Sequence, residues 1–421
     1  MTDPAVKPDV VIVAAVRTAL GRLGGSLKDV QPEELGRVVI EAAVQRAGVA
    51  PAEVDEVILG QTKQSADAAN LARVAALKAG FPVEVPAYTV MRQCGSGLQA
   101  VHSTVQAIWC GEAEVVVAGG VESMSLAPYY LRGARFGFVS GNTVVVDSNT
   151  ESQPRSQPYE VYGDLTMGLT AENLAEQYGV TREEQDAYAL RSQERAFAAI
   201  EGGRFRDEVV PVRVPARKGP AQVFDTDEYP RRTSREKLAA LAPAFKDGGT
   251  VTAGNASGRN DGAACLVLMT AAEAARRGLQ PLATVRAQAV AAVDPRVMGI
   301  GPAPATRRAL EKAGLALADV GLVEVNEAFA AQTLAVVREL GLDEAITNVN
   351  GGAIALGHPL GCSGARILTT LLYEMRRRGT RYGLASICIA GGQGRATIVE
   401  AAGWPAPRAH ADSTVLKERE L

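Results

Sequence analysis

The feature that most constrains the fold of this 421-residue chain is an internal repeat. Residues 47–60, AGVAPAEVDEVILG, align without gaps with residues 313–326, AGLALADVGLVEVN. In each copy a helix is expected to end at a glycine, followed by a short acidic turn and an apolar strand. A chance likeness between two α/β segments is the alternative that this pair alone leaves open.

A second pair of segments repeats at nearly the same offset. Residues 94–120 read as a cysteine, glycines, a helix and the strand EVVVAGG. Residues 361–392 read as a glycine-rich loop, a helix and the strand GLASICIAGG. Two copies of one α/β unit account for this alternation of strands and helices, so we expect a duplicated α/β fold with predominantly parallel sheets.

The segment between the two copies differs in character. It contains polar, loop-like runs such as SNTESQPRSQPYE, and residues 170–200 read as two exposed helices. An inserted segment of this kind is typical of a lid or a ligand-binding region. We therefore predict four parts: a first half (1–120 plus 249–275), an insertion (121–248), a second half (276–402) and a loose tail (403–421).

Composition argues against several classes of protein. The net charge is −3, without the basic excess of a nucleic-acid-binding protein. No apolar stretch approaches the ~18 residues that cross a bilayer, and the N-terminus has no secretory pattern. Five widely spaced cysteines fit a reducing cytoplasm better than a disulfide framework. CxxC and HExxH are absent and only three histidines occur, so we expect no metal site.

The stretch MRQCGSGLQAV, residues 91–101, places Cys94 directly before a helix. A thiol at a helix N-terminus has a lowered pKa and suits a nucleophile. Gly95 and Gly97 would let a substrate approach the backbone closely. The alternative is a small buried residue at the start of the helix. The predicted apolar face of this helix consists of Leu98, Val101, Val105 and Ile108.

The stretch NVNGGAIALGHPLGCSGA, residues 348–365, holds His358 before Pro359. A residue before proline is biased away from helical geometry, so the imidazole is expected on a loop where the next helix begins. There it can accept a thiol proton or donate to an oxyanion. The alternative role is to cap the helix.

Two further residues follow predicted strands. Cys388 lies near the end of GLASICIA, at the kind of strand end where open α/β sheets bind ligands, although a buried strand cysteine is the alternative. Asn326, in VEVNEAFAAQ, is expected either to cap a helix or to hold a water or a carbonyl. Cys110 and Cys265 lack such a context and are expected in the core, and Cys362 is expected to be structural.

Together these segments resemble the thiolases, the acetyl-CoA acyltransferases, from about residue 10 to residue 400. The motifs that carry the resemblance are QCGSGLQAV, AGGVESMS, MGLTAEN, VTAGNASGRNDGAA, NEAFA, GGAIALGHPLGCSGARI and CIAGGQG. The resemblance implies two βαβαβαββ halves in a five-layered αβαβα body, with a loop domain inserted in the first half. It also implies a homo-oligomer, either a dimer or a tetramer.

The implied reaction is a ping-pong thiolysis of 3-ketoacyl-CoA to acetyl-CoA and a shortened acyl-CoA, or the reverse Claisen condensation. Cys94 would be the acylated nucleophile, activated by His358, and Cys388 the general acid/base at the α-carbon. One oxyanion hole would use His358 and a water held by Asn326. The other would use the backbone N–H groups of Cys94 and Ala390. Coenzyme A is a substrate here, with no permanently bound cofactor.

The resemblance also implies residues that bind the ligand. Ser257 would contact the pantetheine arm. Arg231 would contact the nucleotide phosphates, with Arg232 as a competing candidate. Three further residues would line the acyl pocket, unless they are ordinary core residues: Met167, Met298 and Phe329.

Two departures from the family pattern bear on activity. CIAGG replaces the usual CxGGG, so if the first glycine of that turn needs a positive φ, Ala390 costs about 1 kcal/mol and shifts an oxyanion donor. The segment 142–166, which the resemblance places beside the ligand, departs from the family pattern and carries Thr166 where biosynthetic acetoacetyl-CoA thiolases often carry histidine. This departure leaves the acyl-chain preference open. A ketoacyl synthase of the same fold would replace the second cysteine, so Cys388 argues against it. A catalytically weak CoA-binding subunit is the alternative that Ala390 keeps open.

Overall fold

The computed structural model describes residues 7–216 and 219–403. Its main sheet consists of two halves with matching strand order, joined by a short pairing of β1 with β12. The first half runs β4 (Ala87–Val90), β3 (Glu56–Gly60), β5 (Val115–Ser123), β11 (Asn260–Thr270) and β1 (Val10–Thr18). The second half runs β13 (Leu322–Val325), β14 (Tyr382–Ile389), β15 (Gln393–Ala401) and β12 (Ala283–Ala292).

Equivalent strands of the two halves carry the sequence repeat. β3 and β13, which end the repeated segments, hold matching places beside β5 and β14. The helices before them, α1 (Pro32–Ala47) and α10 (Pro302–Ala313), each end at a left-handed glycine, Gly48 and Gly314. The duplication predicted from the repeat is therefore confirmed.

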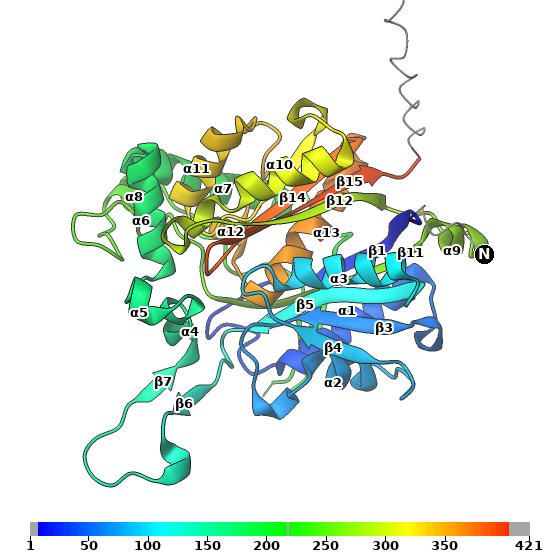
Figure 1. Cartoon of the computed structure of the whole chain (residues 1–421), viewed down its shortest axis with the longest axis horizontal. Helices are drawn as coiled ribbons and strands as arrows, with labels where there is room; N and C mark the ends of the chain where they lie inside the picture. The colour runs from blue at the N-terminus through cyan, green and yellow to red at the C-terminus, as the bar shows by residue number, and fades with distance from the viewer. Residues whose placement is uncertain (1–6, 217–218, 404–421) are drawn as a thin grey trace, which may run out of the picture.

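Helices form three layers, one on the outer face of each half and one between the halves (Figure 1). α1 and α2 (Leu71–Lys78) cover the outer face of the first half, and α10 and α11 (Ala330–Leu340) cover that of the second. α3 (Ser96–Cys110) and α13 (Leu360–Arg378) pack against each other between the halves. This is the expected αβαβα arrangement of five layers.

The central helices approach each other closely because glycines line their contact. A Cβ on Gly97 would lie 2.8 Å from the carbonyl oxygen of Gly361, and one on Gly364 would lie 2.5 Å from the backbone nitrogen of Leu98. The N-terminal ends of α3 and α13 are therefore held side by side, which brings the loops that precede them together.

The predicted core residues are largely buried. The four apolar side chains predicted for the face of α3 are buried, and so are Cys265 and Cys362. Cys110 is exposed, so its assignment to the core is wrong. It lies two residues after the buried Ile108, and successive helical positions turn by about 100°, so its side chain points away from the sheet.

The prediction of predominantly parallel sheets is also wrong. β3 pairs in parallel with β4 and β5, and β13 with β14. However, β11 is antiparallel to both of its long neighbours, and so is β15. Only residues 390–392 connect β14 to β15, and a connection this short permits only an antiparallel pair.

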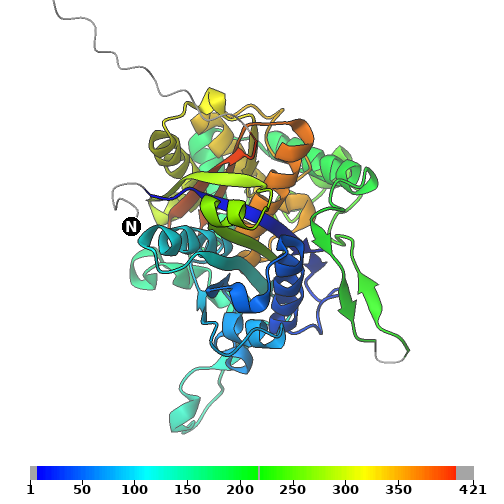
Figure 2. The same ribbon diagram turned by 90° about the vertical axis from the view of Figure 1, so that its right-hand side faces the viewer.

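Between β5 and β11 lies the inserted segment. The two helices predicted within residues 170–200 are α6 (Met167–Tyr178) and α7 (Arg182–Glu201). Two hairpins, β6 (Tyr129–Leu131) with β7 (Val145–Asp147) and β9 (Val212–Val214) with β10 (Gln222–Phe224), project from the body in different directions (Figure 2). The insertion also contains α4 (Ser148–Glu151), α5 (Tyr159–Tyr162), β8 (Val209–Val210) and α8 (Arg235–Ala239).

A buried ion cluster ties the insertion to the first half. Arg17, on β1, pairs with Glu208 at 2.6 Å and with Asp227 at 2.8 Å. The remaining short elements are β2 (Gly21–Arg22), α9 (Ala271–Arg276) and α12 (Ala353–Leu356). Of the helices in the described ranges, none is long and apolar enough to cross a membrane. The predicted tail lies outside the described residues after Gly403.

Candidate active site

Two cysteines and a histidine line a single cavity of about 170 Å³. Cys94 lies on the loop before α3, His358 on the loop before α13, and Cys388 near the carboxyl end of β14. The close contact between α3 and α13 explains why the first two meet. The structure thus brings together the three residues that the sequence predicted as chemically active.

Cys94 is nearly buried, with 8% of its surface exposed. Burial raises the pKa of its thiol to about 11, although the backbone N–H groups of Ala390 and Cys94 act in the opposite direction. The predicted lowering of this pKa at the helix N-terminus is therefore wrong, because burial outweighs the effect of the helix. The resting group is a neutral thiol, which needs a base to become a nucleophile.

The glycines beside Cys94 serve the packing of the protein. A Cβ on Gly95 would lie 2.5 Å from the side chain of Ile389, and Gly97 is in contact with α13. The space that these glycines leave is thus filled by neighbouring residues rather than kept for a substrate. Before them, Gln93 has a positive φ of 45°, a backbone conformation that costs a non-glycine residue on the order of 1–3 kcal/mol.

His358 is held as a neutral imidazole with one nitrogen free. Its Nδ1 lies 2.6 Å from the Oγ of Ser363, and that hydroxyl donates to the carbonyl oxygen of Pro359 at 2.9 Å. Since the hydroxyl proton is used, Nδ1 must carry the hydrogen of the ring, and Nε2 keeps its lone pair. Within the described chain Nε2 is buried without a hydrogen-bond partner.

The charge state of His358 follows from its surroundings. Burial, and then the positive charge of Arg366, lower its pKa to about 3. Its backbone N–H donates to the Oδ1 of Asn260 at 2.9 Å, which fixes the loop. A neutral imidazole whose Nε2 is free is suited to accept a thiol proton.

Cys388 is the second thiol of the cavity and is 1% exposed. Burial raises its pKa, and the proximity of Cys94 raises it further. In the turn that follows, positive φ falls on Gly391 (84°) and Gly392 (80°), and Ala390 does not have a positive φ. The strain that an alanine would cause at a positive φ therefore does not arise at Ala390.

Asn326 follows β13, beside the end of β14, and its backbone N–H donates to the carbonyl oxygen of Ser386 at 2.9 Å. The N-cap residue of α11 is Phe329, so the interpretation of Asn326 as a helix cap is wrong. Both polar atoms of its fully buried side chain lack a partner among the described residues. A buried, unpaired amide is suited to hold a water, although Asn326 itself does not line the cavity.

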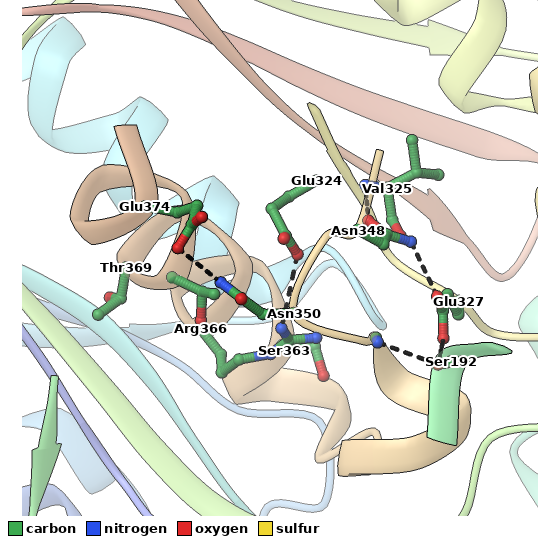
Figure 3. Close-up of polar contacts among 12 residues, drawn as sticks. Ser192, Glu324, Val325, Glu327, Asn348, Asn350, Ser363, Arg366, Thr369 and Glu374 are labelled. Atoms are coloured by element: carbon green, nitrogen blue, oxygen red, sulfur yellow. Dashed lines mark hydrogen bonds and ion pairs between the residues drawn. The ribbon is translucent and has the colours of Figure 1, made fainter. Parts of the chain in front are cut away.

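Glu327 anchors the loop that carries Asn326 (Figure 3). Its carboxylate accepts hydrogen bonds from the Oγ of Ser192 at 2.7 Å, the Oη of Tyr188 at 2.9 Å and the Nδ2 of Asn348 at 3.0 Å. Tyr188 and Ser192 lie on α7, so this network fastens the insertion to the second half. The loop position is thereby set by buried polar contacts.

A buried ion pair lies behind His358. Arg366, on α13, faces Glu324, on β13, with 3.8 Å between Nη1 and Oε2 (Figure 3). Burial raises the pKa of Glu324 to about 8, against the effect of Arg366. The positive charge of Arg366 helps to keep His358 unprotonated.

Most residues predicted to bind the ligand lie at the cavity. Ser257, Met167, Met298 and Phe329 all line it. Phe329 also packs edge-to-face against Phe245, with 5.9 Å between ring centroids.

The two candidate phosphate-binding arginines do not line the cavity. The guanidinium of Arg231 lies 4.7 Å from the ring centroid of Tyr229, and that ring covers Gly258, the neighbour of Ser257. Arg232 pairs with Glu201 at 2.7 Å on the surface. Of the two, Arg231 therefore has the closer connection to the cavity.

For one wall of the cavity the sequence predicted the segment but none of its individual residues. This wall comes mainly from α4 and the residues after it, in the part of the insertion that resembles no motif. No pattern in the sequence marks these residues as functional. They are Asn149, Ser152, Gln153 and Ser156. Arg259, in the motif VTAGNASGRNDGAA, also lines the cavity. In the part of the chain that the structure describes, no group of three or more His, Cys, Asp or Glu residues could hold a metal ion.

Comparison with known proteins relates this chain to one family along most of its length. The family description "Thiolase, N-terminal domain" matches residues 10–272, and "Thiolase, C-terminal domain" matches residues 279–401. A Pseudomonas aeruginosa protein named acetyl-CoA acetyltransferase is 58% identical over 387 residues, covering 92% of this chain and 98% of that protein.

Solved structures agree. The Bacillus anthracis acetyl-CoA acetyltransferase is 52% identical with a TM-score of 0.91, covering 94% of this chain and 99% of that one. Human mitochondrial 3-ketoacyl-CoA thiolase in complex with CoA is 47% identical with a TM-score of 0.89, covering 94% and 98%.

Proposed function

This chain belongs to the thiolase family and is an acyltransferase, and we propose that its reaction proceeds through an acyl-enzyme on Cys94. The substrates are 3-ketoacyl-CoA and CoA in thiolysis, and two acyl-CoA molecules in the reverse condensation. One observation carries the mechanism: a single cavity holds the Cys94 thiol, the free Nε2 of His358 and the Cys388 thiol.

In the first half of thiolysis, Nε2 of His358 accepts the thiol proton as Sγ of Cys94 attacks the 3-keto carbon. The N–H groups of Cys94 and Ala390 stabilise the resulting oxyanion. The bond between carbons 2 and 3 then breaks, which leaves the shortened acyl group on Sγ. The acetyl-CoA enolate takes a proton from Cys388 and departs.

The enolate requires its own stabilisation. Its oxygen would accept a hydrogen bond from the protonated Nε2 of His358 and another from a water held by Asn326. The unpaired amide of Asn326 supports this role. In the second half of the reaction Cys388, now a thiolate, accepts the thiol proton of a free CoA, whose sulfur attacks the acyl-enzyme. The bond from the acyl carbon to Sγ of Cys94 breaks, the shortened acyl-CoA is released, and the Cys94 thiolate takes its proton back from His358.

The test is thiolysis of 3-ketoacyl-CoAs from four to sixteen carbons with free CoA, with Cys94→Ala as the control. We expect turnover by the natural chain and none by the variant, together with an acyl adduct on Cys94 detected by mass spectrometry. Normal folding without turnover at any length would instead favour a catalytically weak CoA-binding subunit.

Three further features belong to this proposal. The insertion acts as the CoA-binding and lid segment, with Arg231 at the phosphates. Ser257, which follows the insertion in the first half, contacts the pantetheine arm. Binding of CoA by Arg231→Ala, compared with Arg232→Ala, tests the assignment of Arg231. The chain acts in the cytoplasm, an assignment supported by five unpaired cysteines.

A homo-oligomer, dimer or tetramer, is supported by the arm formed by residues 129–147. Apolar side chains are strongly exposed on it, including Phe136 (92%) and Val144 (75%). Light scattering on the purified chain, with Phe136→Ser as the comparison, tests whether this arm holds subunits together.

A further inference from the structure

Lys63 is buried beside the active-site cavity and has no role in the reaction above. Only 6% of it is exposed. Its Nζ donates to the carbonyl oxygen of Ser148 at 3.0 Å and to the Oγ of Ser152 at 2.5 Å. Among the described residues no carboxylate lies within ion-pair distance of this ammonium. Burying an ammonium that has only neutral hydrogen-bond partners lowers stability. The contacts within the fold do not offset this cost, so a role in binding a ligand would explain the presence of Lys63.

The carboxylate that acts most strongly on Lys63 is already occupied. Glu122 is fully buried, and its oxygens accept hydrogen bonds from the N–H and Oγ1 of Thr62, from the N–H of Lys63 and from the N–H of Gly361. These donors compensate its charge and tie the loop after β3 to α13. Glu122 therefore has a structural role of its own. The charge of Asp147 also acts on Lys63, but its carboxylate is not within ion-pair distance, so the Nζ of Lys63 has no anion in direct contact in the described part of the chain.

Ser152 connects Lys63 to the cavity. It lines the cavity together with Cys94. Its Oγ accepts the hydrogen bond from Lys63, so its own proton is available to a further acceptor. Lys63 is also close enough to Cys94 for its charge to favour the thiolate. The positive charge of Lys63 thus acts on the space where the acyl group must lie.

The other residues that line the cavity add a positive charge and no negative one. Of the described residues that line the cavity, none is Asp or Glu, and one, Arg259, carries a full positive charge. Arg259 donates to the Oγ1 of Thr150 at 3.4 Å and lies 3.9 Å from Asp147, a contact too long to neutralise it fully. Arg259 therefore lines the cavity, and Lys63 lies behind Ser152 without lining the cavity itself. Apolar residues such as Met298 and Phe329 make up another part of the lining.

We propose that Lys63, Ser152 and Arg259 form a subsite for a carboxylate at the far end of the acyl group. The preferred substrates are then CoA esters of short dicarboxylic acids, since the cavity of about 170 Å³ has room for only a few carbons. This inference rests on the proposed function, because the acyl group enters the subsite only if it is placed on Cys94. A charged donor and an anion form hydrogen bonds roughly twice as strong as neutral ones, so the subsite discriminates strongly.

Binding measured by calorimetry tests the subsite without turnover. In a Cys94→Ala background, which prevents acylation, three pairs of equal carbon count are compared: succinyl-CoA with butyryl-CoA, glutaryl-CoA with pentanoyl-CoA, and adipoyl-CoA with hexanoyl-CoA. For at least one pair we expect the carboxylate-ended ligand to bind on the order of 10- to 100-fold more tightly. Lys63→Met should remove this preference, whereas Lys78→Met, a surface control, should keep it.

The outcomes separate the subsite from the mechanism. Equal binding within all three pairs overturns the subsite, and so does a preference that survives Lys63→Met. If Lys63→Met does not fold, Ser152→Ala replaces it, and the preference should fall several-fold. Free CoA should bind equally to all variants; a loss with CoA alone would assign Lys63 to the CoA phosphates and overturn the proposal. If the natural chain thiolyses acetoacetyl-CoA but the binding assay shows no preference for a carboxylate, the subsite alone is refuted. If the preference is present but the natural chain shows no thiolysis, the acyl-enzyme mechanism alone is refuted.

Discussion

Replacing Ser363 with alanine is expected to slow the acylation of Cys94 without opening a cavity. The change removes one oxygen atom, which accepts the Nδ1 hydrogen of His358 at 2.6 Å and donates to Pro359 at 2.9 Å. The imidazole must then bury an unpaired Nδ1–H or move its hydrogen to Nε2. In the second case Nε2 no longer accepts the thiol proton.

The magnitude follows from the cost of the unpaired donor. A buried N–H without a partner costs about 1–3 kcal/mol, and 1.4 kcal/mol corresponds to a factor of ten. The reactive tautomer is disfavoured by that amount, so kcat/KM for acetoacetyl-CoA should fall on the order of five- to 100-fold. The free energy of unfolding should fall by about 1 kcal/mol.

A matched control lies on the same helix. Thr369, like Ser363, is buried and donates its hydroxyl hydrogen to the carbonyl oxygen four residues earlier, at 2.9 Å, but it does not contact His358. Thr369→Val should therefore lower stability about as much as Ser363→Ala while leaving kcat/KM within about twofold. Steady-state thiolysis and urea unfolding measure both quantities. If the two variants have the same kcat/KM, Ser363 does not set the tautomer and the reasoning is refuted.

Three further predictions concern groups around the site. Glu327→Gln should lower the free energy of unfolding in urea by about 2–4 kcal/mol, because an amide cannot accept from all the donors that the carboxylate accepts; an unchanged midpoint would contradict this. Ala390→Gly should leave kcat within about twofold because Ala390 has no positive φ. Gly391→Ala should instead lower the melting temperature, because Gly391 has a φ of 84° and a Cβ there would lie 2.6 Å from the carbonyl oxygen of Ser156. Burial raises the pKa of Glu324 to about 8 from a usual value near 4.5, so the free energy of unfolding should decline as pH rises from about 4.5 to about 8. Glu324→Gln should flatten that decline, which urea unfolding at successive pH values measures.

Much of the fold was predictable because its signals are local. A glycine that ends a helix, a short turn and an apolar strand recur in both halves, and Gly48 and Gly314 take the same left-handed conformation. Strand direction was not predictable in the same way. The orientations of β11 and β15 depend on what connects them to β5 and β14, a long insertion in one half and a short turn in the other.

For the site as well, features with a local sequence signal were predicted and features that depend on distant segments were not. Cys94, His358 and Cys388 lie in motifs with distinctive local composition, so their meeting in one cavity was predicted. The pKa of Cys94 was predicted in the wrong direction, since the helix terminus is visible in the sequence but the burial that raises the pKa is produced by distant segments. Ser152 and its neighbours were not singled out within the segment predicted to border the ligand, because only the fold of the insertion decides which of them reach the cavity.

The duplication also explains how two unlike groups come to face each other. α3 and α13 hold equivalent places in the two halves, and the loop before each carries one reactive group, Cys94 in the first and His358 in the second. Two copies of the same residue would supply either two nucleophiles or two bases, whereas the chemistry needs one of each. The contact of Gly97 with Gly361 brings both loops to one end of the central layer. Divergence at two equivalent positions of a repeated unit therefore suffices to produce a nucleophile with its base.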